Sequence, residues 1–183
     1  MQVPPLARLA VLAALSLLLG CAPRVPGAAN TTAKARASDF SLRALDGSNV
    51  RLSDYLGRDV VLLTFWATWC TPCLGEVPHL VKLHETYKDK GLKVLSIAMD
   101  GPETIANVEP TARRYGVTYP VLLDEDTRVM AVYNPARDAP FTVLIGKDGT
   151  IAETRVGHAP GDEKILEEHL LALMGQSAPG PSK

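Results

Sequence analysis

The chain has 183 residues, of which 46% are hydrophobic and 21% are charged, and its 19 Lys+Arg nearly balance its 20 Asp+Glu. This length suits one globular domain with extensions, and this composition excludes a wholly disordered, collagen-like or polytopic membrane protein. A near-neutral chain without a basic block gives no electrostatic reason to expect nucleic acid as a partner. The three cysteines, Cys21, Cys70 and Cys73, are too few for a disulfide scaffold and cannot all pair with one another.

The amino terminus has the features of an export signal. Arg8 precedes the apolar run Leu9–Leu19, and a small residue, Gly20, follows it. The uncharged stretch is shorter than the ~20 apolar residues that span a bilayer. Leu18-Leu19-Gly20-Cys21 resembles a bacterial lipobox, which implies that residues 1–20 are a lipoprotein-type signal peptide and that Cys21 is lipidated. The alternative is a plain signal peptide or a short membrane anchor, with Cys21 incidental.

The segments next to the folded part lack apolar periodicity. Residues 21–37 are predicted to form the lipidated Cys and a flexible tether, and residues 175–183 a disordered tail. The folded domain should therefore be residues 38–174, an ordinary size for one domain. Two or more acyl chains on Cys21 would give stable anchoring. The predicted location is extracytoplasmic, as a bacterial membrane-anchored lipoprotein that faces the periplasm if there are two membranes.

Within residues 38–174, apolar patterns alternate between strands and helices. Two hairpins are predicted at turn signals, Asp46-Gly47 and Asp148-Gly149. The expected strands are residues 40–45, 49–52, 60–66, 92–99, 120–123, 141–145 and 150–156, and the expected helices are 71–88, 102–115, 127–133 and 162–174. Pro110 should kink the second helix, and Gly175 should end the last. This order favours an α/β fold whose sheet is covered on both faces.

The motif that carries chemistry is Trp69-Cys70-Thr71-Pro72-Cys73. Two cysteines at this spacing can form a redox pair or half of a zinc site, or can occur by chance. A zinc site needs about four ligands, and no second Cys pair or His-x₃₋₅-His follows. The pair lies where a buried strand meets a helix, and Pro72 suits the first helical turn. This position favours redox chemistry.

The expected roles of the two cysteines follow from their place on the helix. Cys70 lies at the helix start, where free N–H groups and the positive end of the helix dipole stabilise a thiolate. Cys73 lies one turn further on and is expected to be more covered by the fold. Cys70 is therefore predicted to be the attacking thiol and Cys73 the resolving thiol.

The residues from Phe65 to Cys73, followed by Leu74-Gly75-Glu76-Val77-Pro78, resemble the active-site segment of the thioredoxin superfamily and its TlpA/ResA-like branch. The resemblance implies a thioredoxin-like fold with a central mixed β-sheet flanked by helices, an N-terminal β-hairpin and a central βα insertion at residues 100–133. It also implies a cis-proline at Pro140, with Ala139 offering backbone groups to an extended partner peptide. The alternative for Pro140 is an ordinary trans proline at a strand edge.

The same resemblance draws attention to Glu76 and Trp69. Thr64 stands where thioredoxin carries a buried acidic residue, and Glu76, three residues after Cys73, is the obvious replacement. Glu76 would then take the Cys73 proton or tune the thiol pKa values. The alternative is an ordinary solvated glutamate. Trp69 is expected to form an apolar wall beside the active site.

The function predicted from these features is that of an extracytoplasmic thiol–disulfide oxidoreductase that uses the Cys70–Cys73 couple and no cofactor. By resemblance it reduces disulfides in exported proteins, such as apocytochrome c or copper-centre proteins, and receives electrons from a membrane-embedded thiol reductant. The alternative is a thioredoxin-fold copper chaperone that binds Cu(I) through Cys70, Cys73 and a histidine. A peroxiredoxin is disfavoured because the chain lacks Pro-x-x-x-Thr-x-x-Cys upstream of Cys70.

Overall fold

The computed structural model describes residues 34–176. The predicted signal peptide, Cys21, the tether up to residue 33 and the tail from residue 177 lie outside these residues. No helix within the described range is long and apolar enough to cross a membrane.

In the described part of the chain, seven strands form one mixed sheet in the order β2-β1-β5-β4-β3-β6-β7. The strands are β1 (Ser41–Ala44), β2 (Asn49–Arg51), β3 (Val60–Trp66), β4 (Leu92–Ala98), β5 (Val121–Leu123), β6 (Phe141–Ile145) and β7 (Ile151–Val156). β3, β4 and β5 are parallel, and the remaining pairs are antiparallel. The hairpin β1–β2 joins the sheet through β5, so both the N-terminal hairpin and the central insertion are as predicted.

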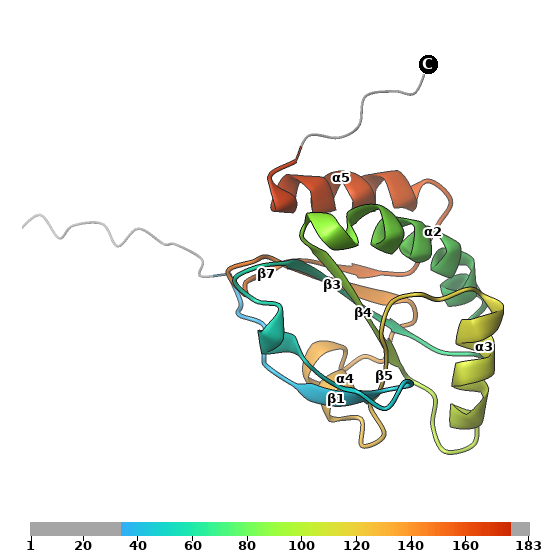
Figure 1. Cartoon of the computed structure of the whole chain (residues 1–183). Coiled ribbons are helices and arrows are strands. Elements are labelled where there is room, and N and C mark those ends of the chain that lie inside the picture. Colours follow the sequence, from blue (N-terminus) through green and yellow to red (C-terminus); the bar gives the residue numbers. More distant parts are fainter. Residues whose placement is uncertain (1–33, 177–183) are drawn as a thin grey trace, which may run out of the picture. The chain divides into compact units, whose positions relative to one another are not determined.

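Helices cover both faces of this sheet (Figure 1). They are α2 (Thr71–Tyr87), α3 (Val108–Arg114), α4 (Arg128–Tyr133) and α5 (Asp162–Met174), with short 3-10 turns at Leu52–Asp54, Lys88–Lys90 and Ile105–Asn107. α2 and α5 lie together over one face, and α4 lies on the other.

The central strand β3 explains why the sheet needs two covered faces. Its seven residues are all buried, as the continuous apolar run predicts. Val60 and Leu62 point toward α2 and α5, whereas Val61, Leu63 and Phe65 pack on the α4 side. The alternation of side chains along one strand thus divides the core into two layers.

The helix predicted at residues 102–115 is shorter in the structure, so its predicted bounds are wrong. The chain first turns at Ile105–Asn107, and α3 begins only at Val108. Pro110 is therefore the third helical residue, where a backbone N–H has no intrahelical acceptor, so the proline does not interrupt hydrogen bonding. It belongs to the start of the helix and is not a kink in its middle.

The predicted start of the folded part also needs correction. The Ala37 N–H donates to the Gly149 carbonyl at 2.9 Å, and the Ile151 N–H donates to the Ala35 carbonyl at 2.7 Å. Residues 35–37 are thus held by the turn between β6 and β7 and are not part of the tether. The last helix ends at Met174, and Gly175 follows in the left-handed conformation that the stop signal required.

The packing of α5 on β3 gives a stability prediction. Leu170 is fully buried against the sheet, whereas Ile165 on the same helix is exposed. Leu170→Ala should lower the free energy of unfolding by about 2–5 kcal/mol because it leaves a cavity in the core. Ile165→Ala, the matched control, should change it by less than about 1 kcal/mol. Urea unfolding of the oxidised protein measures both, and equal effects would contradict the observed packing.

Candidate active site

The two cysteines of the motif lie at the junction of β3 and α2. Cys70 is the N-cap of α2, with an extended backbone, and Pro72 lies in the first turn. The Cys70 Sγ accepts a hydrogen bond from the Cys73 N–H at 3.2 Å. The two residues are joined by a disulfide, and their Cα atoms are 5.3 Å apart. In the reduced protein, a Cys70 thiolate would thus face the free N–H groups of the helix start, which stabilise negative charge.

Burial does not separate the two cysteines as strongly as expected. Cys70 is 5% exposed and Cys73 is 2% exposed, and both pack among Trp66, Ala67 and Ala98. The different roles predicted for them therefore rest on position at the helix start more than on accessibility. Trp69, immediately before Cys70, is 60% exposed and presents an apolar surface beside the pair.

The loop before Cys70 is fixed by Asp100, a residue that the sequence analysis did not single out. The Asp100 carboxylate accepts hydrogen bonds from the Thr68 N–H at 3.0 Å and from the Thr68 Oγ1 at 2.5 Å. Asp100 follows the carboxyl end of β4, which is parallel to β3. Only the pairing of these two strands reveals that residues 32 positions apart meet here.

The Ala139–Pro140 peptide bond is cis, as the resemblance implied. Ala139 packs against the same apolar cluster as Cys70 and Cys73, and the Pro140 carbonyl accepts a hydrogen bond from the Gly157 N–H at 2.8 Å. The preceding loop is held by the buried Asn134 side chain, which bonds both the carbonyl and the N–H of Asp138 at 2.8 and 3.0 Å. Asn134 is a second positioning residue without a sequence signal, because its partners are backbone groups.

Glu76 is buried at 6% exposure, which rules out the solvated alternative. It lies one turn after Cys73 on α2. Burial raises the pKa of its carboxyl from 4.5 to about 7, and the nearby positive charge of Arg155 only partly opposes this shift. A carboxyl that titrates near neutral pH can both accept and release a proton under physiological conditions.

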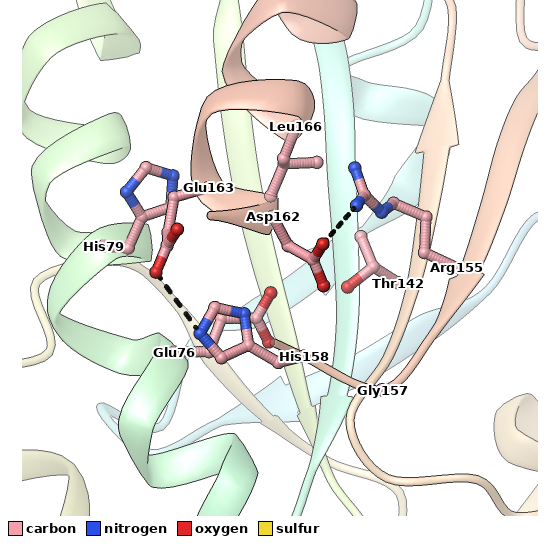
Figure 2. A pocket seen from close by; sticks show the side chains of 9 residues that line it. All are labelled: Glu76, His79, Thr142, Arg155, Gly157, His158, Asp162, Glu163 and Leu166. Atoms are coloured by element: carbon pink, nitrogen blue, oxygen red, sulfur yellow. Dashed lines mark ion pairs between the residues drawn. The ribbon is translucent and has the colours of Figure 1, made fainter. Parts of the chain in front are cut away.

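Figure 2 shows the small polar cavity into which Glu76 points. It is lined by residues of α2, β6, β7, the loop after β7 and α5: Glu76, His79, Thr142, Arg155, Gly157, His158, Asp162, Glu163 and Leu166. Thr142 is the cross-strand partner of Thr64. The carboxylate supplied by α2 thus lies beside the strand position at which thioredoxin carries its own acid.

His84, His158 and His169 each lie close to another side chain. His84 is buried and its ring meets the edge of Tyr119, with centroids 5.9 Å apart. His158 Nε2 lies 3.6 Å from Glu163 Oε1, and His169 Nδ1 lies 2.5 Å from Glu153 Oε2. No cluster of three or more His, Cys, Asp or Glu with metal-binding geometry occurs in residues 34–176.

Comparison with known proteins agrees with this site. Residues 33–154 match the AhpC/TSA family. The thiol–disulfide oxidoreductase ResA of Geobacillus kaustophilus is 36% identical to this chain over 137 residues, which cover 75% of each chain. The ResA of Halalkalibacterium halodurans is 32% identical over 166 residues, which cover 89% of this chain and 91% of the other. The crystal structure of a Chlorobium tepidum protein assigned as the thiol:disulfide interchange protein DsbE superposes with a TM-score of 0.71 at 30% identity, covering 78% of this chain and 97% of that chain.

The chain therefore belongs to the AhpC/TSA family and has a thioredoxin-like fold. Within this class it is a thiol–disulfide oxidoreductase of the ResA/DsbE type, and Cys70-Thr71-Pro72-Cys73 is its cysteine pair.

The raised pKa of Glu76 predicts a pH-dependent stability. The folded protein keeps this proton up to about pH 7, whereas the unfolded chain loses it near pH 4.5. Above pH 7 the buried carboxylate is charged and lowers the free energy of unfolding by about 2–3 kcal/mol. At pH 4.5 and below, where the carboxyl is protonated in the folded protein, this cost is absent. Glu76→Gln should remove this cost, so its stability relative to the wild type should increase by that amount between pH 4.5 and 8. Urea unfolding of the oxidised proteins measures the difference.

The matched control is Glu168→Gln, which changes an exposed glutamate of α5. Its stability relative to the wild type should vary little with pH. A difference between Glu76→Gln and the wild type that stays constant across this range would show that Glu76 titrates at its ordinary pKa.

Proposed function

We propose that this enzyme works outside the cytoplasm as a reductant of disulfides in exported proteins. One observation carries the proposal: Cys70 caps α2 next to the cis-proline loop and the exposed Trp69, while a buried acid lies one turn beyond Cys73. This arrangement gives a thiolate, a surface for a partner peptide and a proton acceptor within one small region.

The reaction begins with the reduced enzyme. The Cys70 thiolate attacks one sulfur of the substrate disulfide, which forms a mixed disulfide and releases the other substrate sulfur as a thiolate. Glu76 takes the proton of Cys73, and the Cys73 thiolate attacks the Cys70 sulfur. The second substrate thiolate leaves, so the substrate gains two electrons and the enzyme ends as the Cys70–Cys73 disulfide.

The cis-proline loop supports the docking of an extended substrate. Ala139 is half-buried next to the cysteine cluster, and its backbone groups precede the cis bond. An extended peptide can pair with such backbone groups as an added strand, while Trp69 contributes apolar contact. Main-chain pairing accepts many sequences, so the substrate is selected chiefly by an accessible cysteine pair.

The amino terminus supports the proposed location. A lipidated Cys21 would hold the enzyme at the membrane, where a membrane-embedded thiol reductant can return the Cys70–Cys73 disulfide to the dithiol. The relatives named ResA and DsbE carry thiol–disulfide oxidoreductase and interchange activities in their names. Exported substrates with a pair of cysteines, such as apocytochrome c or copper-centre proteins, fit this chemistry.

Trapping with the full-length protein tests the proposal. Cys73→Ser should leave Cys70 joined to the substrate, because no resolving thiol remains, and the complex should be recovered from the membrane fraction by non-reducing electrophoresis. Mass spectrometry then identifies the partner. Cys70→Ser is the control and should trap at least tenfold less, since its remaining thiol, that of Cys73, is not at the N-cap of α2.

Two results would overturn the proposal. Equal trapping by Cys70→Ser would show that Cys70 is not the attacking thiol. A reduction potential well above that of the glutathione couple, at about −200 mV or higher, would favour an oxidase over a reductant.

A further inference from the structure

The cavity beside Glu76 contains more polar groups than the cysteine chemistry alone requires. His79 enters it from α2, Arg155 from β7, His158 from the loop after β7, and Asp162 and Glu163 from the start of α5 (Figure 2). Four separate segments thus direct charged or titratable side chains toward one buried carboxyl.

Buried nitrogen atoms in this cluster point to water. Within the described residues, His79 Nε2 and Arg155 Nη1 are buried and have no hydrogen-bond partner. The other terminal nitrogen of Arg155, Nη2, lies 3.8 Å from Asp162, which is longer than a hydrogen bond. The enclosed space admits about one water molecule, and both hydrogen-bond donors and acceptors surround it. A water here would satisfy donors that would otherwise cost stability.

His158 lies where this cavity meets solvent. Its side chain is 14% exposed, and its Nε2 faces the Glu163 carboxylate, which is 32% exposed. Imidazole gains and loses a proton near neutral pH, unlike the guanidinium of Arg155. The other histidine, His79, is less suited, since burial lowers its pKa.

We propose that the cavity holds water and carries protons between Glu76 and solvent, with His158 as the exchanging group at its outer end. This inference rests on the proposed role of Glu76 as acceptor of the Cys73 proton. In each cycle, Glu76–COOH passes its proton through water to the neutral imidazole of His158, and the resulting imidazolium releases it to solvent. The carboxylate is thereby restored, and no electrons move in this step.

The surroundings of Glu76 leave few other routes. Burial is the main cause of the raised pKa of Glu76; Arg155 lowers this pKa, and Asp162 and Glu163 raise it further. Tyr119 also faces Glu76, but its hydroxyl is buried and its pKa is raised, so it does not ionise at neutral pH. His158 lies at the solvent border of the described cavity, and an imidazole ring can both accept and donate a proton.

The test follows proton and thiolate release together. Reduced full-length enzyme is mixed with an aromatic disulfide whose two product thiols stay ionised at pH 7. The first aromatic thiolate leaves when the Cys70 thiolate attacks, and closing the Cys70–Cys73 bond releases the second thiolate, seen by absorbance, and one proton, seen with an indicator dye. In the wild type the proton signal should rise together with release of the second thiolate.

In His158→Gln, proton release should lag thiolate release by about tenfold, because Gln cannot carry the proton. His158→Gly should show the same lag, and added imidazole should abolish it by replacing the missing ring. His169→Gln is the matched control, since His169 pairs with Glu153 away from the cavity, and it should behave as the wild type. A purely structural role for His158 would not be rescued by imidazole.

The outcomes separate this inference from the function on which it rests. If Glu76→Gln closes the disulfide at the wild-type rate, Glu76 is not the proton acceptor and the proposed mechanism itself fails. If Glu76→Gln is slow but both His158 variants release protons at the wild-type rate, the mechanism stands and the inference about His158 is wrong. Unchanged melting temperatures of the variants establish that each comparison is made on folded protein.

Discussion

The site depends on one constraint: the N-terminus of α2 must lie at the carboxyl end of a fully buried strand. β3 pairs with β4 on one side and β6 on the other over nearly its whole length, so its end cannot shift. Cys70 therefore caps α2 at a fixed place, where unpaired N–H groups stabilise a thiolate without full exposure to water. The same pairing brings Asp100 and the cis-proline loop to opposite sides of the cysteine pair.

A second constraint follows from Thr64. Because β3 carries a hydroxyl at this buried position, the carboxylate must come from another element, and α2 supplies Glu76. A carboxylate on this face of α2 points toward β7 and α5, at the carboxyl-terminal end of the chain. The cysteines and the proposed proton acceptor, Glu76, thus lie within one short segment, whereas the charged groups that adjust the pKa of Glu76 lie some 80 residues later, from Arg155 to Glu163.

Features that depend on neighbouring residues could be predicted from the sequence, whereas features that depend on distant residues could not. The bounds of β3 and α5 follow from a continuous apolar run and from Gly175, because both signals are local. The cysteine pair and Glu76 also belong to one motif. Tertiary structure alone brings three further residues close to their partners: Asp100, Asn134 and Arg155. Asp100 and Asn134 bind backbone groups, which every residue carries and which therefore leave no pattern in the sequence. The sequence overestimates the length of the helix at Val108–Arg114, because the apolar pattern does not mark where the preceding turn ends.

One short loop serves both sides of the cysteine pair. The Gly157 N–H donates to the Pro140 carbonyl, and the next residue, His158, borders the cavity of Glu76. The surface proposed for the substrate and the polar cluster behind the cysteines are therefore joined by adjacent residues. Any substitution in residues 157–161 can act on both, so overall turnover alone cannot assign its effect. Loss of substrate docking raises KM, whereas slow proton release lowers the rate after the disulfide has closed, and only measurements of both distinguish the two.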